Sequence, residues 1–216
     1  MSKITIIAGH YGSGKTNVAV ALALEMRRIH EKTALADLDT VNPYFRAADS
    51  AKLLSDNGIT PLIPIYANTN VDIPALPESL RSAFDTDIYS VFDVGGDDDG
   101  ATVLAAFKEE IEECGYEMYC VINMYRPMTA SPESAAAYLR AMELASTLRF
   151  CGLINNSNLG SLTIPETVTA SLGYADKVAE LTGLPIYRTT ALSALRGKLD
   201  HIPGITYIEN TTKQLF

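Results

Sequence analysis

The sequence is poor in cysteine and in long apolar runs. Its three cysteines, Cys114, Cys120 and Cys151, form no CxxC pair and no zinc-binding spacing, and so small and odd a set is not a disulfide framework. We therefore expect free thiols, buried or half-buried. No apolar run approaches the roughly 18 residues of a membrane span, and the apolar stretch near the N-terminus is too short for a signal peptide. These absences predict a soluble, cytoplasmic protein that does not bind membranes.

Positive charge is also scarce. Against 26 Asp and Glu residues stand 17 Lys and Arg, which gives a net charge of −9. A protein that binds nucleic acid through a broad basic face has the opposite balance, so no nucleic-acid partner is expected. Hydrophobic residues make up 47% of the 216 and charged residues 20%, as in globular proteins. Together with the absence of linkers or repeats, this predicts a single domain over residues 1–216.

Short apolar runs alternate with segments of helical spacing along the chain. This rhythm is typical of β-α-β units, and it predicts an α/β fold with a mostly parallel sheet flanked by helices on both sides. Helices are expected over 101–114 and 165–183 and from Ser131-Pro132, a typical helix start. Strands are expected at 4–8, 33–39, 62–66, 87–92, 117–123, 150–154 and 184–187.

One glycine-rich segment fits a phosphate-binding pattern without mismatch. It follows an apolar strand and precedes an amphipathic helix, which is the context that G-x-x-x-x-G-K-[ST] requires. Glycines let the backbone N–H groups curl around an anion, and the helix adds its positive end. Lys15 would reach the β- and γ-phosphates, and Thr16 would offer its hydroxyl to Mg²⁺. The predicted phosphate-binding residues are Gly9, His10, Tyr11, Gly12, Ser13, Gly14, Lys15, Thr16 and Asn17.

Acidic residues end two of the predicted strands. Asp93 precedes Gly95-Gly96, a position that suits a water-mediated contact with Mg²⁺, although an Asp there can also cap the next helix. Asp37 and Asp39 are two residues apart, so they share one face of a strand and can point into the crevice at its carboxyl end. One would hold a metal-bound water while the other orients an attacking water. The alternative is an ordinary pair of turn residues.

At these residues the chain resembles the MinD/ParA-type branch of P-loop ATPases, which includes the CobB/CobQ nucleotide-binding domains. The resemblance implies a sheet of seven or eight strands, ATP or ADP with Mg²⁺, slow hydrolysis, and an ATP-dependent homodimer or another protein partner. It assigns Lys15 and Asp39 to catalysis, with Asp39 orienting the water, and Thr16, Asp37 and Asp93 to Mg²⁺. The segments that carry it are GHYGSGKT at 9–16, ALADLDTVNPYFR at 34–46 and VFDVGGD at 91–97.

The sequence departs from that branch in three places. His10 stands where relatives carry a signature lysine that crosses a dimer to the partner's phosphates, and a histidine gives no permanent charge. Gly100 stands where the nitrogenase iron protein, a member of the same branch, has the cysteine that binds its iron–sulfur cluster. No iron–sulfur cluster is therefore expected. No basic amphipathic tail follows Ile205, so membrane docking of the MinD kind is not expected.

The base and the partner are less well defined by the sequence. No guanine-gripping Asp follows the strand at 150–154; Asn155 is the candidate for adenine, with a plain turn residue as the alternative. The first functional hypothesis is an ATPase switch. The second is an ATP-dependent synthetase of CobB or dethiobiotin-synthetase type, whose substrate would need cations such as Arg46, Arg126 or Arg188. The third is an adaptor that binds ATP and hydrolyses it negligibly.

Overall fold

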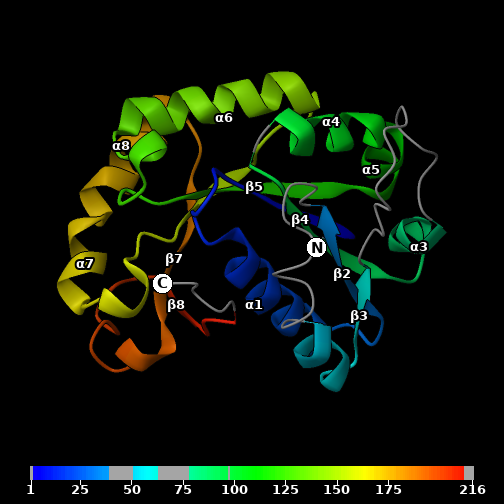
Figure 1. Ribbon diagram of the computed structural model, residues 1–216, viewed down its shortest axis with the longest axis horizontal. Coiled ribbons are helices and arrows are strands. Elements are labelled where there is room, and N and C mark those ends of the chain that lie inside the picture. The colour runs from blue at the N-terminus through cyan, green and yellow to red at the C-terminus, as the bar shows by residue number, and fades with distance from the viewer. Residues whose placement is uncertain (1, 39–50, 63–77, 97, 212–216) are drawn as a thin grey trace.

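Eight parallel strands form one continuous sheet in the computed structural model (Figure 1). The structure describes residues 2–38, 51–62, 78–96 and 98–211. Every neighbouring pair of strands runs parallel, so the expected α/β class is confirmed. The strand order is β3-β2-β4-β1-β5-β6-β7-β8. The strands are β1 (Ile4–Ala8), β2 (Thr33–Leu38), β3 (Ile59–Leu62), β4 (Tyr89–Val94), β5 (Tyr116–Ile122), β6 (Gly152–Asn155), β7 (Ile186–Leu192) and β8 (Ile205–Ile208).

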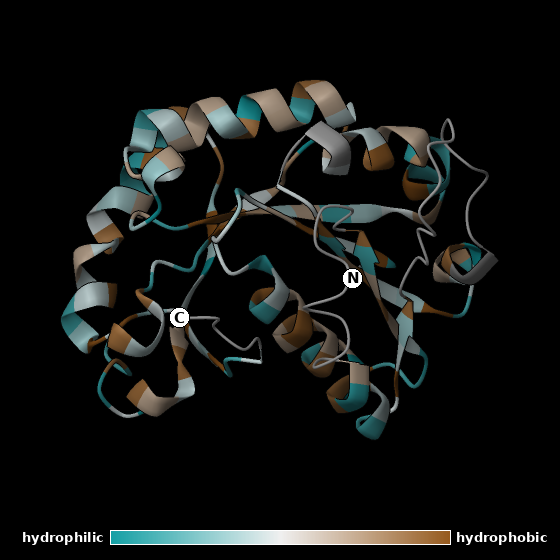
Figure 2. Ribbon diagram, in the orientation of Figure 1, coloured by the Kyte–Doolittle hydropathy of each residue, from teal (hydrophilic) through white to brown (hydrophobic). Residues whose placement is uncertain are grey.

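Helices cover both faces of the sheet. Helix α1 (Lys15–Arg27) packs on one face, where Ile7, Leu35 and Val91 lie in its apolar cluster. The opposite face carries the larger cluster, built on Ile6 and Phe92. The helices on that side are amphipathic, with hydrophobic and hydrophilic stripes visible in Figure 2. They are α4 (Asp98–Ala106), α5 (Lys108–Cys114), α6 (Pro132–Ser146) and α8 (Leu172–Thr182); α3 (Glu78–Arg81) and α7 (Pro165–Ala170) are shorter.

The topology determines where a ligand can bind. Strand β1 lies between β4 and β5, and the chain leaves it through α1 to reach β2, beyond β4. From β5 onward the strands are added on the other side. In open parallel sheets the crevice for a ligand opens at such a switch point, outside the carboxyl ends of the strands. The loop that follows β1 therefore lies at the switch point, where a ligand is expected to bind.

Several sequence predictions were wrong in detail. The third strand begins at Ile59 rather than at 62, because Pro61 is tolerated on an edge strand, where its missing N–H is not needed. The rest of that prediction, 63–66, lies outside the described residues. The helices expected at 101–114 and 165–183 are each divided in two, at Phe107 and at Ser171. Strand β8, at Ile205–Ile208, had not been assigned.

Two further expectations concern the state of the cysteine thiols and the presence of membrane-spanning helices. The three thiols are free, but Cys151 is exposed rather than half-buried. Burial raises the pKa of the Cys120 thiol to about 12, which keeps it protonated. None of the helices in the described part of the chain combines the length and the apolar character that a membrane span needs.

Candidate functional site

The predicted phosphate loop, residues 9–14, connects the end of β1 directly to the start of α1. Within it the Ser13 N–H donates to the His10 carbonyl oxygen at 3.0 Å, and the Gly14 carbonyl receives the Val18 N–H that starts the helix. Gly14 has a φ of +86° and lies so close to Asn156 that a Cβ would stand 2.3 Å from its Nδ2 atom. Only glycine satisfies both constraints. The first N–H groups of α1 have no partner inside the helix and are directed at the loop.

Two side chains hold the loop from outside. Arg126 donates from Nε to the Gly12 carbonyl at 2.7 Å, and Asn156 donates from Nδ2 to the Ser13 carbonyl, also at 2.7 Å. In a planar trans peptide the N–H points away from the carbonyl oxygen. Fixing the Ser13 carbonyl therefore turns the Gly14 N–H to the side of the peptide opposite Asn156. The loop is held in its curled form by hydrogen bonds from the rest of the protein.

Asn156 is itself fixed by a buried polar network. Its Oδ1 accepts from the Thr190 hydroxyl at 2.7 Å, so a chain of hydrogen bonds joins β7 to the phosphate loop. Neither Asn156 nor Thr190 was among the predicted site residues. The run of asparagines after β6 did signal a polar role, but successive strand residues face opposite sides, and the end of the strand was not known well enough to choose between Asn155 and its neighbour.

Asn155, the predicted adenine contact, lies at the end of β6. Its side chain is fully buried. Its Nδ2 donates to the Ser171 hydroxyl at 2.9 Å, and its Oδ1 accepts from the Ser157 hydroxyl at 2.8 Å. Both polar atoms of the Asn155 side chain therefore have protein partners, and its contact with a base stays a prediction. Its role in the structure is to fix the segment that carries Asn156.

Two predicted acidic residues come together beside the loop. Asp37 and Asp93 are direct partners in the β2–β4 register, and Asp93 is also the partner of Ile7 in β1. Asp37 lies two residues after Leu35, and Asp93 lies two residues after Val91; both of these apolar residues pack in the cluster beneath α1. Because every second strand residue faces the same side, both carboxylates face the side where α1 begins. Asp37 is 7% exposed, Asp93 2% and Lys15 3%. Asp39 lies outside the described residues.

These residues fit a magnesium ion bound with a nucleotide. Two buried carboxylates on adjacent strands repel one another unless a cation compensates them. Carboxylate, hydroxyl and phosphate oxygens are the ligands that Mg²⁺ prefers, and it takes one or two carboxylates with waters and phosphates rather than an all-protein cage. In the described ranges no group of three or more His, Cys, Asp or Glu side chains lies close enough together to hold a metal. Thr16, at the first turn of α1, adds a hydroxyl.

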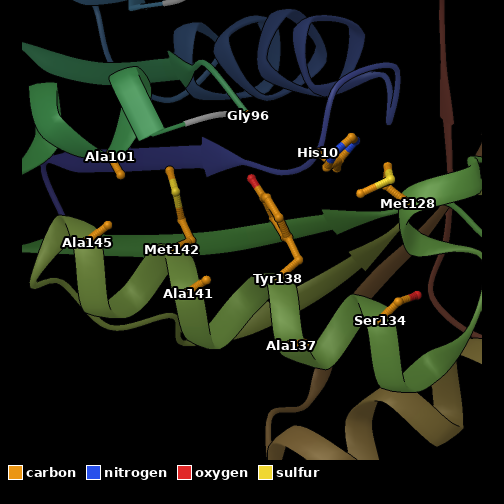
Figure 3. Close-up of a pocket in the computed structure, with 10 residues that line it drawn as sticks. All are labelled: His10, Gly96, Ala101, Met128, Ser134, Ala137, Tyr138, Ala141, Met142 and Ala145. Atoms are coloured by element: carbon orange, nitrogen blue, oxygen red, sulfur yellow. The ribbon is translucent and has the colours of Figure 1, made fainter.

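The loop after β4 packs tightly against the phosphate loop. A Cβ on Gly96 would stand 2.4 Å from the Gly9 carbonyl oxygen and 2.8 Å from the Tyr11 nitrogen, so the two backbones are in contact. Beside this contact opens a cavity of about 580 Å³ (Figure 3). Tyr138 and Met142 point into it from α6. Its lining residues are His10, Gly96, Ala101, Met128, Ser134, Ala137, Tyr138, Ala141, Met142 and Ala145.

Asn17 connects the start of α1 to the last described residues of the chain. Its Oδ1 accepts from the N–H and the hydroxyl of Thr211 at 3.0 and 2.9 Å, and its Nδ2 donates to Asn210 at 3.1 Å. The side chain therefore anchors the segment after β8. A phosphate contact from Asn17 would come from its backbone N–H.

Comparisons with solved structures identify the fold. FtsY from Mycoplasma mycoides matches with a TM-score of 0.56 at 18% identity, over 88% of this chain and 61% of that chain. A nucleotide-binding protein from Archaeoglobus fulgidus, in complex with ADP, matches with a TM-score of 0.53 at 16% identity, over 89% and 82%. FlhF complexed with GMPPNP and Mg²⁺ matches with a TM-score of 0.51 at 19% identity, over 88% and 66%.

The chain has the P-loop NTPase fold. It spans about three fifths of the FtsY chains that it matches. The matched complexes hold an adenine nucleotide in one case and a GTP analogue in the other, so the fold does not decide the base. No protein-family model matches the sequence, and a search of curated proteins finds no relative.

Proposed function

We propose that this protein binds ATP with Mg²⁺ and hydrolyses it slowly, as a nucleotide-controlled switch of MinD/ParA type. The observation that carries the proposal is the curled phosphate loop, with its Gly12 and Ser13 carbonyls held from outside and two buried carboxylates beside it. Because the loop is already ordered before a phosphate binds, little conformational free energy is lost on binding. The two fold neighbours solved in complex with nucleotides support nucleotide binding.

Each residue then has a defined part in hydrolysis. The loop N–H groups and Lys15 hold the phosphates, and Thr16, Asp37 and Asp93 hold the magnesium ion, which neutralises charge on the phosphates when bound. Asp37 and Asp93 act through water. Asp39 orients the attacking water. The role of Asp39 rests on its spacing from Asp37 in the sequence and on the resemblance to the MinD/ParA branch.

ATP rather than GTP is the proposed nucleotide. The proposal rests on the absence of an acidic residue in Asn155-Asn156-Ser157-Asn158, the segment where a guanine-binding Asp would stand, and on the ADP complex of the Archaeoglobus protein. A competition assay tests it. Unlabelled ATP should displace a fluorescent ATP analogue at a lower concentration than GTP does, and equal displacement by GTP would count against adenine selectivity.

The switch reading gains support from the cavity in Figure 3. His10 and Gly96 line it, and both belong to segments in contact at the phosphate loop. A protein that fills the cavity would thus touch the two loops in contact at the proposed phosphate site, and a rearrangement of these loops on nucleotide binding would reach it. The partner would be a second copy of this chain or another protein. Light scattering with Mg·ATP and with Mg·ADP tests the first case, since only ATP should raise the mass.

The same cavity is the observation that favours the alternative, an ATP-dependent synthetase, because a phosphoryl acceptor could enter there. Its lining argues against an acidic acceptor, since His10 is the only one of the ten lining residues able to carry positive charge. Phosphate release measured with and without added small carboxylic acids separates the two functions. Release that depends on an acid indicates a synthetase, and release that does not indicates the switch.

A further inference from the structure

The loop after β5 brings an arginine to the phosphate loop. Arg126 is half-buried, and its Nε donates to the Gly12 carbonyl at 2.7 Å. The Arg126 side chain lies close to the same residue, because a Cβ on Gly12 would stand 3.3 Å from Nε, 3.5 Å from Cδ and 3.7 Å from Cζ. One of the five N–H donors of the guanidinium makes this bond, and four remain.

Hydrogen bonds hold the segment around Arg126 in place. The Arg126 N–H donates to the Asn123 carbonyl at 3.2 Å and its own carbonyl accepts from Thr129 at 3.0 Å. The Tyr125 hydroxyl donates to the Thr167 carbonyl at 2.8 Å, and the Thr129 hydroxyl donates to the Asn123 carbonyl at 3.0 Å. A group carried on so constrained a loop is pre-organised, which is what a catalytic site requires.

The charge of Arg126 is available. Among the residues that the structure describes, no carboxylate lies within ion-pair distance of it. Of the other two arginines considered from the sequence, Arg188 is paired with Glu25 at 2.9 Å and Arg46 lies outside the described residues. His10 stands at the position where relatives carry the signature lysine. Of these three arginines, Arg126 is therefore the one that the structure places at the phosphate loop with a charge unpaired within the described part of the chain.

We propose that Arg126 is a second cation of the phosphate site, in addition to Lys15 and within the same chain, and that it stabilises the charge that develops during hydrolysis. This rests on the proposed function. In that reaction a water oxygen bonds to the γ-phosphorus while the bond to the β–γ bridging oxygen breaks. The products are ADP and inorganic phosphate, and the proton from water stays with the phosphate or passes to solvent. Negative charge grows on the leaving ADP, beside the loop that Arg126 contacts.

The test compares the affinity for Mg·ADP with the affinity for Mg·ADP plus aluminium fluoride, which mimics the phosphoryl group in transfer. The variants are Arg126→Gln and Arg126→Lys. The control is Arg140→Gln, which removes an exposed arginine that also donates to a backbone carbonyl, that of Leu181, from α6. A group acting in the transition state should affect the fluoride complex far more than ADP alone.

For Arg126→Gln we expect a moderate loss of ADP affinity, because the Gly12 carbonyl loses its donor, a further loss of at least about 10-fold in the gain from aluminium fluoride, and a kcat lower on the order of 10²-fold. Arg126→Lys should recover part of the gain from aluminium fluoride and part of kcat, and the control Arg140→Gln should change neither quantity. An equal loss in both complexes would show that Arg126 only shapes the loop, and this would overturn the proposal. So would a wild type that binds ADP but gains nothing from fluoride. A wild type that binds no nucleotide would instead refute the proposed function itself.

Discussion

Replacing Asn156 by alanine should weaken nucleotide binding without any direct contact being lost to the nucleotide. The side chain is 4% exposed and bridges the Ser13 carbonyl and the Thr190 hydroxyl. Thr190 keeps a second acceptor, the Asn155 carbonyl at 3.3 Å, but the buried Ser13 carbonyl loses the partner described here. An unsatisfied buried group costs about 1–3 kcal/mol, so the free energy of unfolding should fall by about that amount.

The effect on binding follows from the freed peptide. If the Ser13–Gly14 unit is no longer fixed, the nucleotide must order it, which costs roughly 1–2 kcal/mol per residue. This corresponds to an affinity for Mg·ADP that is roughly 5- to 30-fold lower. The matched control is Asn158→Ala, which removes two hydrogen bonds from the same segment, to the Asn156 carbonyl and from the Gly160 N–H.

Calorimetric titration with Mg·ADP and chemical denaturation are the assays. Both variants should lose stability, and only Asn156→Ala should lose affinity by the full amount. Unchanged affinity in Asn156→Ala, or equal losses in the two variants, would refute the idea that this side chain holds the phosphate loop ready.

Gly96→Ala should lower the free energy of unfolding by about 1–3 kcal/mol, as overpacking does, and should weaken nucleotide binding, because the new Cβ would stand 2.4 Å from the Gly9 carbonyl. The control Gly173→Ala, with open space around the new Cβ, should change neither quantity when both variants are compared by thermal melts and nucleotide titrations. Asp39→Asn should keep Mg·ATP affinity and lose on the order of 10²–10⁴-fold in turnover, and a phosphate-release rate that survives the change would assign the water to another residue. His10→Lys should raise turnover at protein concentrations where Mg·ATP produces a dimer, and a rate unaffected by the change in the dimer would show that this position does not face the partner's phosphates.

The sequence was most informative where local rules act alone. The glycine-rich loop between a strand and a helix, the start of α6 at Ser131 and the positions of Asp37 and Asp93 near the ends of strands follow from glycine chemistry, capping and strand patterns. The breaks at Phe107 and Ser171 depend on how the helices pack, which no local pattern records. Likewise Arg126 and Asn156 lie 114 and 143 residues from the loop carbonyls that they bind. Only the strand order brings such distant residues together.

The central claim is that the loop after β1 binds a nucleotide through its phosphates. Calorimetry of Mg·ATP binding to the wild type and to Lys15→Ala tests it most directly, because Lys15 is 3% exposed at the start of α1 and its charge would contact the phosphates. Charge-assisted hydrogen bonds contribute about 1.5–3 kcal/mol, so Lys15→Ala should bind roughly 10- to 150-fold more weakly while its circular dichroism stays that of the wild type. Equal affinity in the two proteins, or no binding to either, would contradict the account.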